Sequence, residues 1–275
     1  MKHLRPSFFI IGERKCGTSS LYRYLVAHPQ VLPCKVKEPD LFSKPWYKIA
    51  LGFRNYKKLF PAVDESGNIE FIWPELDEKG QLFNETITVE RQEGVNYITG
   101  EASVNTFYYA NPRILNRLLP GIKIILMLRE PAERAFSHYR MHERFRKEGR
   151  KSMAKTDFVT DIRLEMKKVQ QGEDSLFLGP SIYMKKLPKW LNIFGRDRLF
   201  VIRSEDLQQP EKAVGIMEQL FDYLQITEFD LREMLNQRFN VAPPKQMPED
   251  IREELQAFFA PYNQQLNEFL GLHLY

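Results

Sequence analysis

The 275-residue sequence has only two cysteines, Cys16 and Cys34, which argues against a disulfide-stapled secreted scaffold. Histidines at zinc-ligand spacing are missing around them, so we expect no bound metal. A chain of this length buries about 75% of its unfolded surface and needs no such staples. Hydrophobic residues make up 43% and charged residues 28%, which excludes disordered, collagen-like and coiled-coil chains.

Long apolar runs are also missing. The run after the basic amino terminus, Phe8 to Ile11, is four residues long, and the longest elsewhere is Ile124 to Leu128. A signal peptide needs about 7–15 apolar residues and a membrane-spanning helix about 20, so we expect a soluble, cytoplasmic protein with no membrane partner. The formal charge of +4 is too small to indicate a nucleic-acid partner.

Short apolar runs alternate with helical patterns along the chain, which predicts a parallel sheet with crossover helices. No stretch resembles a linker, so we predict an α/β fold: a single three-layer domain, residues 1–275, with a central parallel sheet. The expected strands are residues 7–12, 122–128 and 199–202, and the expected helices are 19–26, 132–148, 210–224 and 249–270, the last after a rigid turn at 242–245.

Gly12-Glu13-Arg14-Lys15-Cys16-Gly17-Thr18 joins the first expected strand to the first helix. Glycines let backbone N–H groups surround an anion, and a helix amino terminus adds about half a positive charge. The spacing is close to a P-loop, except that Lys15 stands two residues before the second glycine instead of directly after it. The pattern therefore predicts a P-loop-like anion site, with a plain strand-to-helix turn as the alternative.

Arg129 follows the second expected strand, where a P-loop kinase needs an aspartate to hold Mg²⁺. Arginine cannot bind a metal and is instead a preferred partner of phosphate. Ser137 lies eight residues further on, two helical turns into the next helix, where its hydroxyl could reach the same phosphate. The alternative for Arg129 is a surface ion pair, for example with Glu133.

Together these segments resemble sulfotransferases that use 3′-phosphoadenosine 5′-phosphosulfate (PAPS). Residues 9–21 are similar to their 5′-phosphosulfate loop, and residues 124–139 to their 3′-phosphate motif. Within the family the heparan-sulfate and other carbohydrate sulfotransferases are the most similar, because residues 37–42 resemble their Lys-Glu-x-His-Phe-Phe segment. Residues 179–191 and 261–263 are similar to two further motifs of that branch.

The resemblance implies that PAPS is the co-substrate, adenosine 3′,5′-bisphosphate the product, and that no metal takes part. It places Lys15 at the bridging oxygen, where a cation stabilises the charge that develops on the leaving phosphate. Arg129 and Ser137 would hold the 3′-phosphate, with Lys245 as a basic loop residue over it. The loop residues expected to bind the cofactor are Arg14, Lys15, Cys16, Gly17, Thr18 and Ser19.

Glu38 matches the family's general base, with a structural capping carboxylate as the alternative. Asp40 stands where many relatives have histidine, and with Glu101 and Tyr183 it is expected to contact the substrate, although Tyr183 could equally be a buried aromatic. His138 and His142 lie at i, i+4 spacing on one helix, and without a third ligand we expect an exposed helix face and not a metal site.

Residues 61–101 hold ten acidic and two basic residues, whereas residues 129–151 hold eight basic and four acidic ones. Because the acceptor side of a polyanion-modifying enzyme should be basic, we expect a small neutral or cationic acceptor such as a guanidinium alkaloid of secondary metabolism. A solvated acidic surface, and a heparan-type glycan acceptor, remain alternatives. Two further readings are an atypical P-loop kinase and a non-catalytic nucleotide-binding module. The sequence makes no prediction of oligomeric state.

Overall fold

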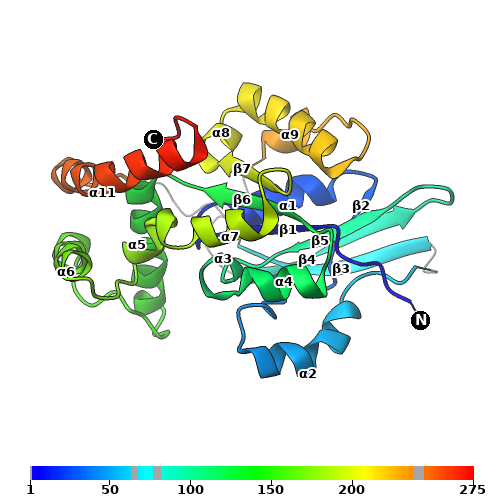
Figure 1. Ribbon diagram of the computed structural model, residues 1–275, viewed down its shortest axis with the longest axis horizontal. Helices are drawn as coiled ribbons and strands as arrows, with labels where there is room; N and C mark the ends of the chain where they lie inside the picture. Colours follow the sequence, from blue (N-terminus) through cyan, green and yellow to red (C-terminus); the bar gives the residue numbers. More distant parts are fainter. Residues whose placement is uncertain (1, 64–66, 77–81, 238–244) are drawn as a thin grey trace. The chain divides into compact units, whose positions relative to one another are not determined.

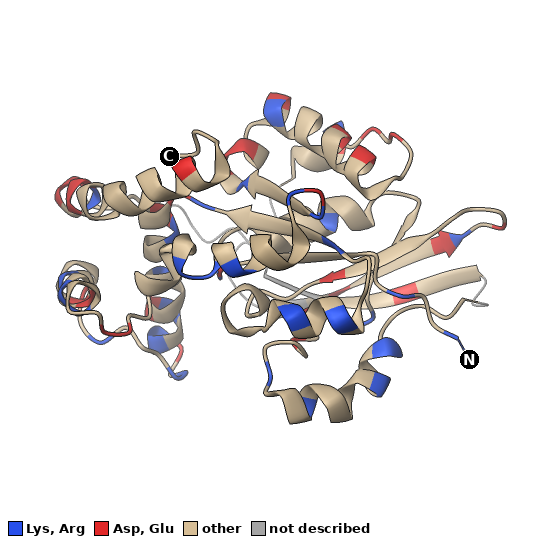
Figure 2. Cartoon of the chain, in the orientation of Figure 1, with Lys and Arg blue, Asp and Glu red and all other residues tan. Residues whose placement is uncertain are grey.

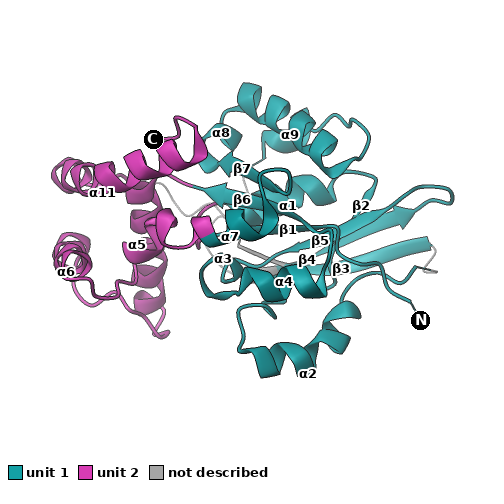
Figure 3. Cartoon of the chain, in the orientation of Figure 1, with its two compact units in different colours: residues 1–12, 17–128, 189–243 teal, residues 13–16, 129–188, 244–275 magenta. Residues whose placement is uncertain are grey.

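The computed structural model describes residues 2–63, 67–76, 82–237 and 245–275. The turn predicted at residues 242–245 lies outside these ranges, apart from Lys245. The described chain divides into two compact units (Figure 3). Unit 1 contains residues 1–12, 17–128 and 189–243, and unit 2 contains residues 13–16, 129–188 and 244–275. Each unit takes residues from several parts of the sequence, and the single domain over residues 1–275 stays a prediction.

A five-stranded parallel sheet forms the centre of unit 1 (Figure 1). All three predicted strands belong to it, which confirms the expected fold class. The apolar residues 8–11 and 124–128 lie in strands that are covered on both faces of the sheet, which is why their apolar sequence is continuous. In spatial order the strands are β2 (Val31–Leu32), β5 (Ile98–Ala102), β1 (Phe8–Gly12), β6 (Lys123–Leu128) and β7 (Leu199–Arg203).

Helices lie on both sides of this sheet. Helices α1 (Thr18–Val26) and α9 (Pro210–Leu224) share one side, where the His28 and Phe221 rings are 4.8 Å apart. On the other side the indole Nε1 of Trp190 donates to the carbonyl of Phe107. That contact joins α7 (Leu187–Phe194) to α3 (Thr106–Tyr109); α4 (Pro112–Leu118) follows α3 along the chain. The shorter helices of unit 1 are α8 (Ser204–Leu207) and α10 (Arg232–Leu235).

Two of the parts of unit 1 that were not predicted from sequence are a helix and a hairpin. Helix α2 (Trp46–Lys57) follows the segment that resembles the acceptor motif. About half of the acidic segment forms an antiparallel hairpin of β3 (Gly67–Leu76) and β4 (Leu82–Arg91). The hairpin packs on the rest of unit 1 through Trp73, whose ring stacks on that of Tyr22 at 5.2 Å. Its regular pairing explains why a strongly acidic stretch is ordered.

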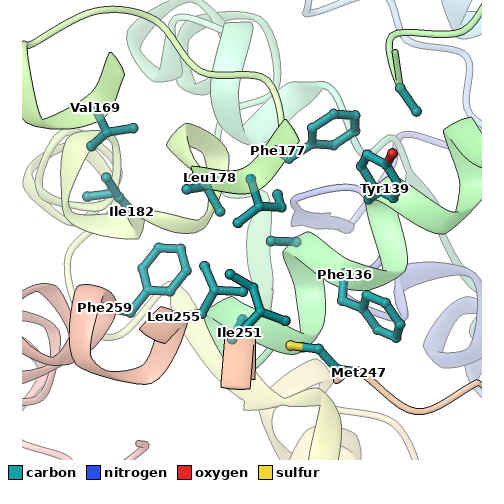
Figure 4. Close-up of a cluster of buried hydrophobic side chains, with 14 residues drawn as sticks. Phe136, Tyr139, Val169, Phe177, Leu178, Ile182, Met247, Ile251, Leu255 and Phe259 are labelled. Carbon is teal, nitrogen blue, oxygen red and sulfur yellow. The ribbon is translucent and has the colours of Figure 1, made fainter. Parts of the chain in front are cut away.

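Unit 2 is helical. Helices α5 (Pro131–Lys147), α6 (Phe158–Gln170) and α11 (Glu249–Leu270), with the short 3₁₀ turns η1 (Gly179–Ser181) and η2 (Tyr183–Lys185), surround a cluster of buried apolar side chains (Figure 4). Helix α5 begins where the sequence predicts, because Pro131 occupies its first turn and the Glu130 carboxylate accepts from the N–H groups of Ala132 and Glu133. Among the described residues, no helix has the length and apolar character needed to cross a bilayer.

Candidate active site

The loop between β1 and α1 has the backbone of an anion site. Lys15 and Gly17 both have positive φ, at 76° and 87°, and successive turns of this kind point backbone N–H groups inward. Gly17 is the N-cap of α1 and supplies no side-chain cap, so the first N–H groups of the helix are available to a ligand. Gly12 is required for a different reason: a Cβ there would lie 2.7 Å from the carbonyl oxygen of Met127.

Arg129 supports this loop within unit 2. Its Nη1 donates to the carbonyl of Lys15 at 3.0 Å, and its backbone accepts from the Tyr183 hydroxyl at 2.7 Å. Its Nε is buried and has no partner among the described residues. A buried guanidinium nitrogen without an acceptor suits an anionic ligand, so the residues present fit a phosphate group here. Glu133, the alternative partner of Arg129, pairs instead with Arg252 at 2.5 Å.

Arg134 is a second cation beside the loop, and the sequence assigned it no role. It is fully buried in α5 and donates to Ser181 Oγ at 2.6 Å, to the carbonyl of Arg14 at 3.1 Å and to the carbonyl of Phe177. Arg134 therefore holds the loop backbone through its hydrogen bond to the carbonyl of Arg14. An arginine in a helix gives no local signal of burial, so only its packing identifies this role.

Glu13 is a buried carboxyl in the same loop. Burial raises its pKa to about 7, while Arg134 and the loop residue Arg14 oppose the rise. Its Oε1 has no hydrogen-bond partner within the described part of the chain. Glu13 therefore adds a titratable group to the anion site near neutral pH.

Cys16 and Tyr183 are buried beside the loop. The Cys16 Sγ lies 3.6 Å from the Tyr183 hydroxyl, and burial raises the pKa of this thiol to about 11. Both cysteines are free, and Cys16 is held as a neutral thiol. Tyr183 is thus the buried aromatic of the two alternatives considered, and its hydroxyl bonds to its own chain.

The expectation that His138 and His142 form an exposed helix face is wrong. They are 4% and 9% exposed, because their side of α5 packs against Phe177. Burial, followed by Arg134 and His142, lowers the pKa of His138 to about 2, so it is neutral at physiological pH. Within the described ranges no three His, Cys, Asp or Glu side chains gather into a set that could hold a metal ion.

Ser137 and Lys245 lie in more open positions of unit 2. Ser137 is half-buried on α5, two turns after Arg129, as the sequence predicts. Lys245 is exposed and lies 3.8 Å from the carboxylate of Glu143. The proposed contact of each with a 3′-phosphate stays a prediction.

The carboxylates that the sequence predicts for acid–base chemistry and substrate contact belong to unit 1. Glu38 and Asp40 flank Pro39, and both adopt left-handed backbone with φ of 53° and 52°. Residues other than glycine rarely adopt this conformation, and strained backbone of this kind clusters at functional sites. The Asp40 Oδ2 accepts from Asn105 Nδ2 at 3.0 Å and from Lys44 Nζ at 3.3 Å. Its Oδ1 is buried and has no partner among the described side chains and backbone.

Glu101 lies beneath this loop and not on its surface. It is 1% exposed at the end of β5, so the expectation that it contacts substrate directly does not fit its burial. Its Oε1 accepts from the Tyr56 hydroxyl at 2.5 Å, and its Oε2 accepts from Ser103 Oγ. The sequence gives no signal for Tyr56, because its contact with Glu101 joins residues 45 positions apart. Ser103 lies only two residues after Glu101, but the sequence does not show that its hydroxyl faces that carboxylate.

The two charged surfaces of unit 1 differ in sign. Residues 41–63 contain five basic residues and no acidic one, and Figure 2 marks basic positions on α2 in blue. Helix α2 also exposes Trp46, Tyr47 and Leu51. In the hairpin, Glu85 pairs with Arg23, whereas Glu70 and Glu90 are exposed. Part of the acidic segment is therefore a solvated surface, and a basic surface directly follows the Glu38–Asp40 loop along the chain.

Comparison with known proteins identifies the family of this chain. The model of the sulfotransferase family matches residues 6–230, so this chain belongs to that family. A crystal structure of a sulfotransferase from Alicyclobacillus acidocaldarius is similar, with 28% sequence identity, a TM-score of 0.62, and coverage of 98% of this chain and 96% of that one. The family predicted from the two nucleotide motifs is confirmed.

Two curated relatives modify carbohydrates according to their names. Carbohydrate sulfotransferase 15 of Mus musculus is 24% identical over 98% of this chain and 54% of its own length. Heparan sulfate glucosamine 3-O-sulfotransferase 5 of Mus musculus is 25% identical over 97% of this chain and 72% of its own length. This chain therefore spans about half the length of the first of these relatives.

Proposed function

We propose that this chain transfers the sulfonyl group of PAPS to a hydroxyl or amine of a carbohydrate acceptor. The observation that carries the proposal is the family match over residues 6–230, which includes the anion loop and Arg129. The unpartnered Nε of Arg129 and the open amino terminus of α1 support the binding of a phosphate-rich co-substrate.

The family resemblance assigns the roles in the reaction. Glu38 takes the proton from the acceptor as the acceptor atom bonds to sulfur. The bond between sulfur and the bridging oxygen breaks, and its electron pair stays on the 5′-phosphate. Lys15 stabilises that charge, and adenosine 3′,5′-bisphosphate leaves. Arg129, Ser137 and Lys245 bind the 3′-phosphate, and the loop N–H groups bind the 5′-phosphate.

A carbohydrate acceptor is favoured by the curated relatives and by the surface of α2. Its exposed Trp46 and Tyr47 offer aromatic faces, and the five basic residues of 41–63 suit an acceptor that carries negative charge. The acidic hairpin favours a second candidate, a small neutral or cationic acceptor, because Glu70 and Glu90 are exposed in the same unit.

The first test is a calorimetric titration with adenosine 3′,5′-bisphosphate, with and without Mg²⁺, beside AMP and ATP–Mg. We expect binding that is independent of Mg²⁺ and requires the 3′-phosphate. Preference for ATP–Mg would overturn the proposal in favour of a kinase, and binding without any transfer from PAPS would favour a non-catalytic module.

The acceptor is tested with radiolabelled PAPS and a panel of N-desulfated heparan, unsulfated chondroitin, small alcohols, amines and guanidines. Incorporation into the polysaccharides supports the carbohydrate acceptor. Incorporation into the small compounds alone would replace it with the second candidate.

A further inference from the structure

A chain of hydrogen bonds joins buried Glu101 to the strained loop of Glu38 and Asp40. The backbone N–H of Asp40 donates to Ser103 Oγ at 3.1 Å, and Ser103 Oγ donates to Glu101 Oε2. The other carboxylate oxygen accepts from the Tyr56 hydroxyl at 2.5 Å. All these residues belong to unit 1, so α2, β5 and the loop meet at one buried carboxyl group.

The direction of these bonds depends on the charge of Glu101. A backbone N–H can only donate, so Ser103 Oγ accepts from Asp40; an ionised Glu101 can only accept, so Ser103 donates its single proton to it. An ionised carboxylate accepts from both hydroxyls and satisfies every donor. A protonated carboxyl must itself donate from one oxygen, which forces either Ser103 or Tyr56 to turn its hydroxyl away.

We propose that Glu101 is a positioning residue for the acid–base loop: its ionised carboxylate holds Ser103 in the orientation that fixes the Asp40 amide, and protonation of Glu101 releases that hold. The loop needs such support because left-handed backbone at Glu38 and Asp40 persists only where surrounding contacts enforce it. The link to catalysis rests on the proposed function, which gives Glu38 the role of base, whereas the hydrogen-bond relay does not depend on it.

Protonation of Glu101 falls in the physiological range. Burial raises its pKa to about 7; the hydrogen bonds from Ser103 and Tyr56 lower it, and the charges of Asp40 and Glu38 raise it further. The titratable groups that face Glu101 are Tyr56 from α2, Tyr22 from α1, Cys34, and the two loop carboxyls Glu38 and Asp40. Tyr22, Tyr56 and Cys34 have pKa values raised by burial and stay neutral, so Glu101 responds to pH near 7.

The relay can be measured without any activity. In protein labelled with ¹³C and ¹⁵N, we expect the carboxyl carbon of Glu101 and the amide of Asp40 to titrate with a shared midpoint near pH 7. In Glu101→Gln the Asp40 midpoint near 7 should disappear. In Ser103→Ala the Glu101 carboxyl should still titrate while the Asp40 amide no longer follows it.

Tyr56→Phe provides a milder variant that removes one hydrogen bond from the ionised carboxylate. We expect it to move the shared midpoint to higher pH. The matched control is Tyr223→Phe, because the Tyr223 hydroxyl donates to the carbonyl of Ile124 in the same unit and does not contact Glu101. The relay would be overturned if the chemical shift of the Asp40 amide did not change as Glu101 titrates. It would also be overturned if the midpoint changed equally in Tyr56→Phe and Tyr223→Phe.

Kinetics test the link to catalysis. Ser103→Ala and Glu101→Gln should lower kcat at least tenfold, with the KM for PAPS and the affinity for adenosine 3′,5′-bisphosphate within twofold of the unaltered enzyme. The loss of kcat below pH 7 in the unaltered enzyme should be absent from the profile of Glu101→Gln. Unaltered kcat in both variants would overturn the positioning role, whereas an unaltered chain that transfers no sulfonyl group would overturn the proposed function and leave the spectroscopic result standing.

Discussion

Glu13 of unit 2 and Glu101 of unit 1 are both buried carboxyls with a pKa raised to about 7, but their neighbours carry opposite charge. Around Glu13 the charged neighbours are Arg134, Arg14 and Lys186, which favour the ionised form. Around Glu101 they are Asp40 and Glu38, which favour the protonated form. Burial is the main cause of the rise in both cases.

The difference between the two surroundings follows the two parts of the proposed reaction. Unit 2 concentrates cations around the anion loop, as expected of a region that binds phosphate. Unit 1 concentrates carboxylates and hydroxyls around a strained loop, as expected of a region that accepts a proton. A substitution in one region should therefore change only the corresponding part of the reaction, either the interactions with phosphate or proton transfer.

The largest effect is expected from the proposed base in unit 1. Glu38→Gln should lower the rate of sulfonyl transfer by about 10²–10⁴-fold, because the acceptor proton loses its carboxylate. The affinity for adenosine 3′,5′-bisphosphate should not change. Steady-state kinetics measures the rate and calorimetry measures the affinity. Glu90→Gln is the control, because Glu90 is an exposed glutamate of unit 1. A rate within twofold of normal would show that Glu38 is the capping carboxylate of the alternative.

Lys15→Ala tests the cationic region. We expect a fall in transfer of about 10²–10³-fold, as for removal of one group that stabilises charge in the transition state. Single-turnover measurements with PAPS check it. Arg14→Ala is the neighbouring control, and an equal loss there would assign the effect to the loop as a whole and not to Lys15.

Arg129→Ala should act on binding. Loss of a charged pair with phosphate should cost about 2–5 kcal/mol of affinity for adenosine 3′,5′-bisphosphate. Calorimetry compares the Arg129→Ala variant with Arg150→Ala, because the Arg150 side chain is 57% exposed and pairs with Glu148. Equal affinity in both variants would remove Arg129 from the nucleotide site.

Glu13 should make stability depend on pH. Because its folded pKa of about 7 lies above the unfolded value of 4.5, its stabilising contribution is complete below pH 4.5 and is lost as pH rises through 7. A shift of this size corresponds to roughly 3 kcal/mol. Urea unfolding at pH 5 and pH 8 should therefore show a smaller decrease for Glu13→Gln than for the unaltered chain. An equal decrease in the free energy of unfolding between pH 5 and pH 8 in both proteins would show that Glu13 does not cause the pH dependence.

The smallest effect on stability is expected at Lys245. It is exposed and its ion pair with Glu143 is 3.8 Å long, so Lys245→Ala should change the free energy of unfolding by less than about 0.5 kcal/mol. Urea unfolding measures this change, and the affinity for adenosine 3′,5′-bisphosphate shows whether the residue contributes to the nucleotide site. A large loss of stability would mean that Lys245 supports the packing of unit 2.

The sequence predicted three of the five strands of the sheet (β1, β6 and β7), helices α1, α5, α9 and α11, and the glycine loop, because each produces a local pattern. Residues 249–270 form α11 as expected, and residues 122–128 form β6 with one residue less. The hairpin and α2 were missed, although Ile69, Phe71 and Trp73 alternate with exposed residues along β3, and Ile49 and Tyr56 of α2 are buried at helical spacing. The histidines of α5 were misjudged because polarity suggested exposure where Phe177 covers them.

The sequence by itself determined the family, the anion loop and the two nucleotide motifs, because their function depends on residue type at fixed spacing along one strand-to-helix connection. Tertiary structure alone decided that Arg134 supports the loop, that Glu101 lies below the acid–base loop, and that Tyr56 and Ser103 bind it. Burial and hydrogen-bond partners depend on segments that are distant in sequence. A charged side chain in an isolated segment therefore carries no sign of its final surroundings or of its pKa.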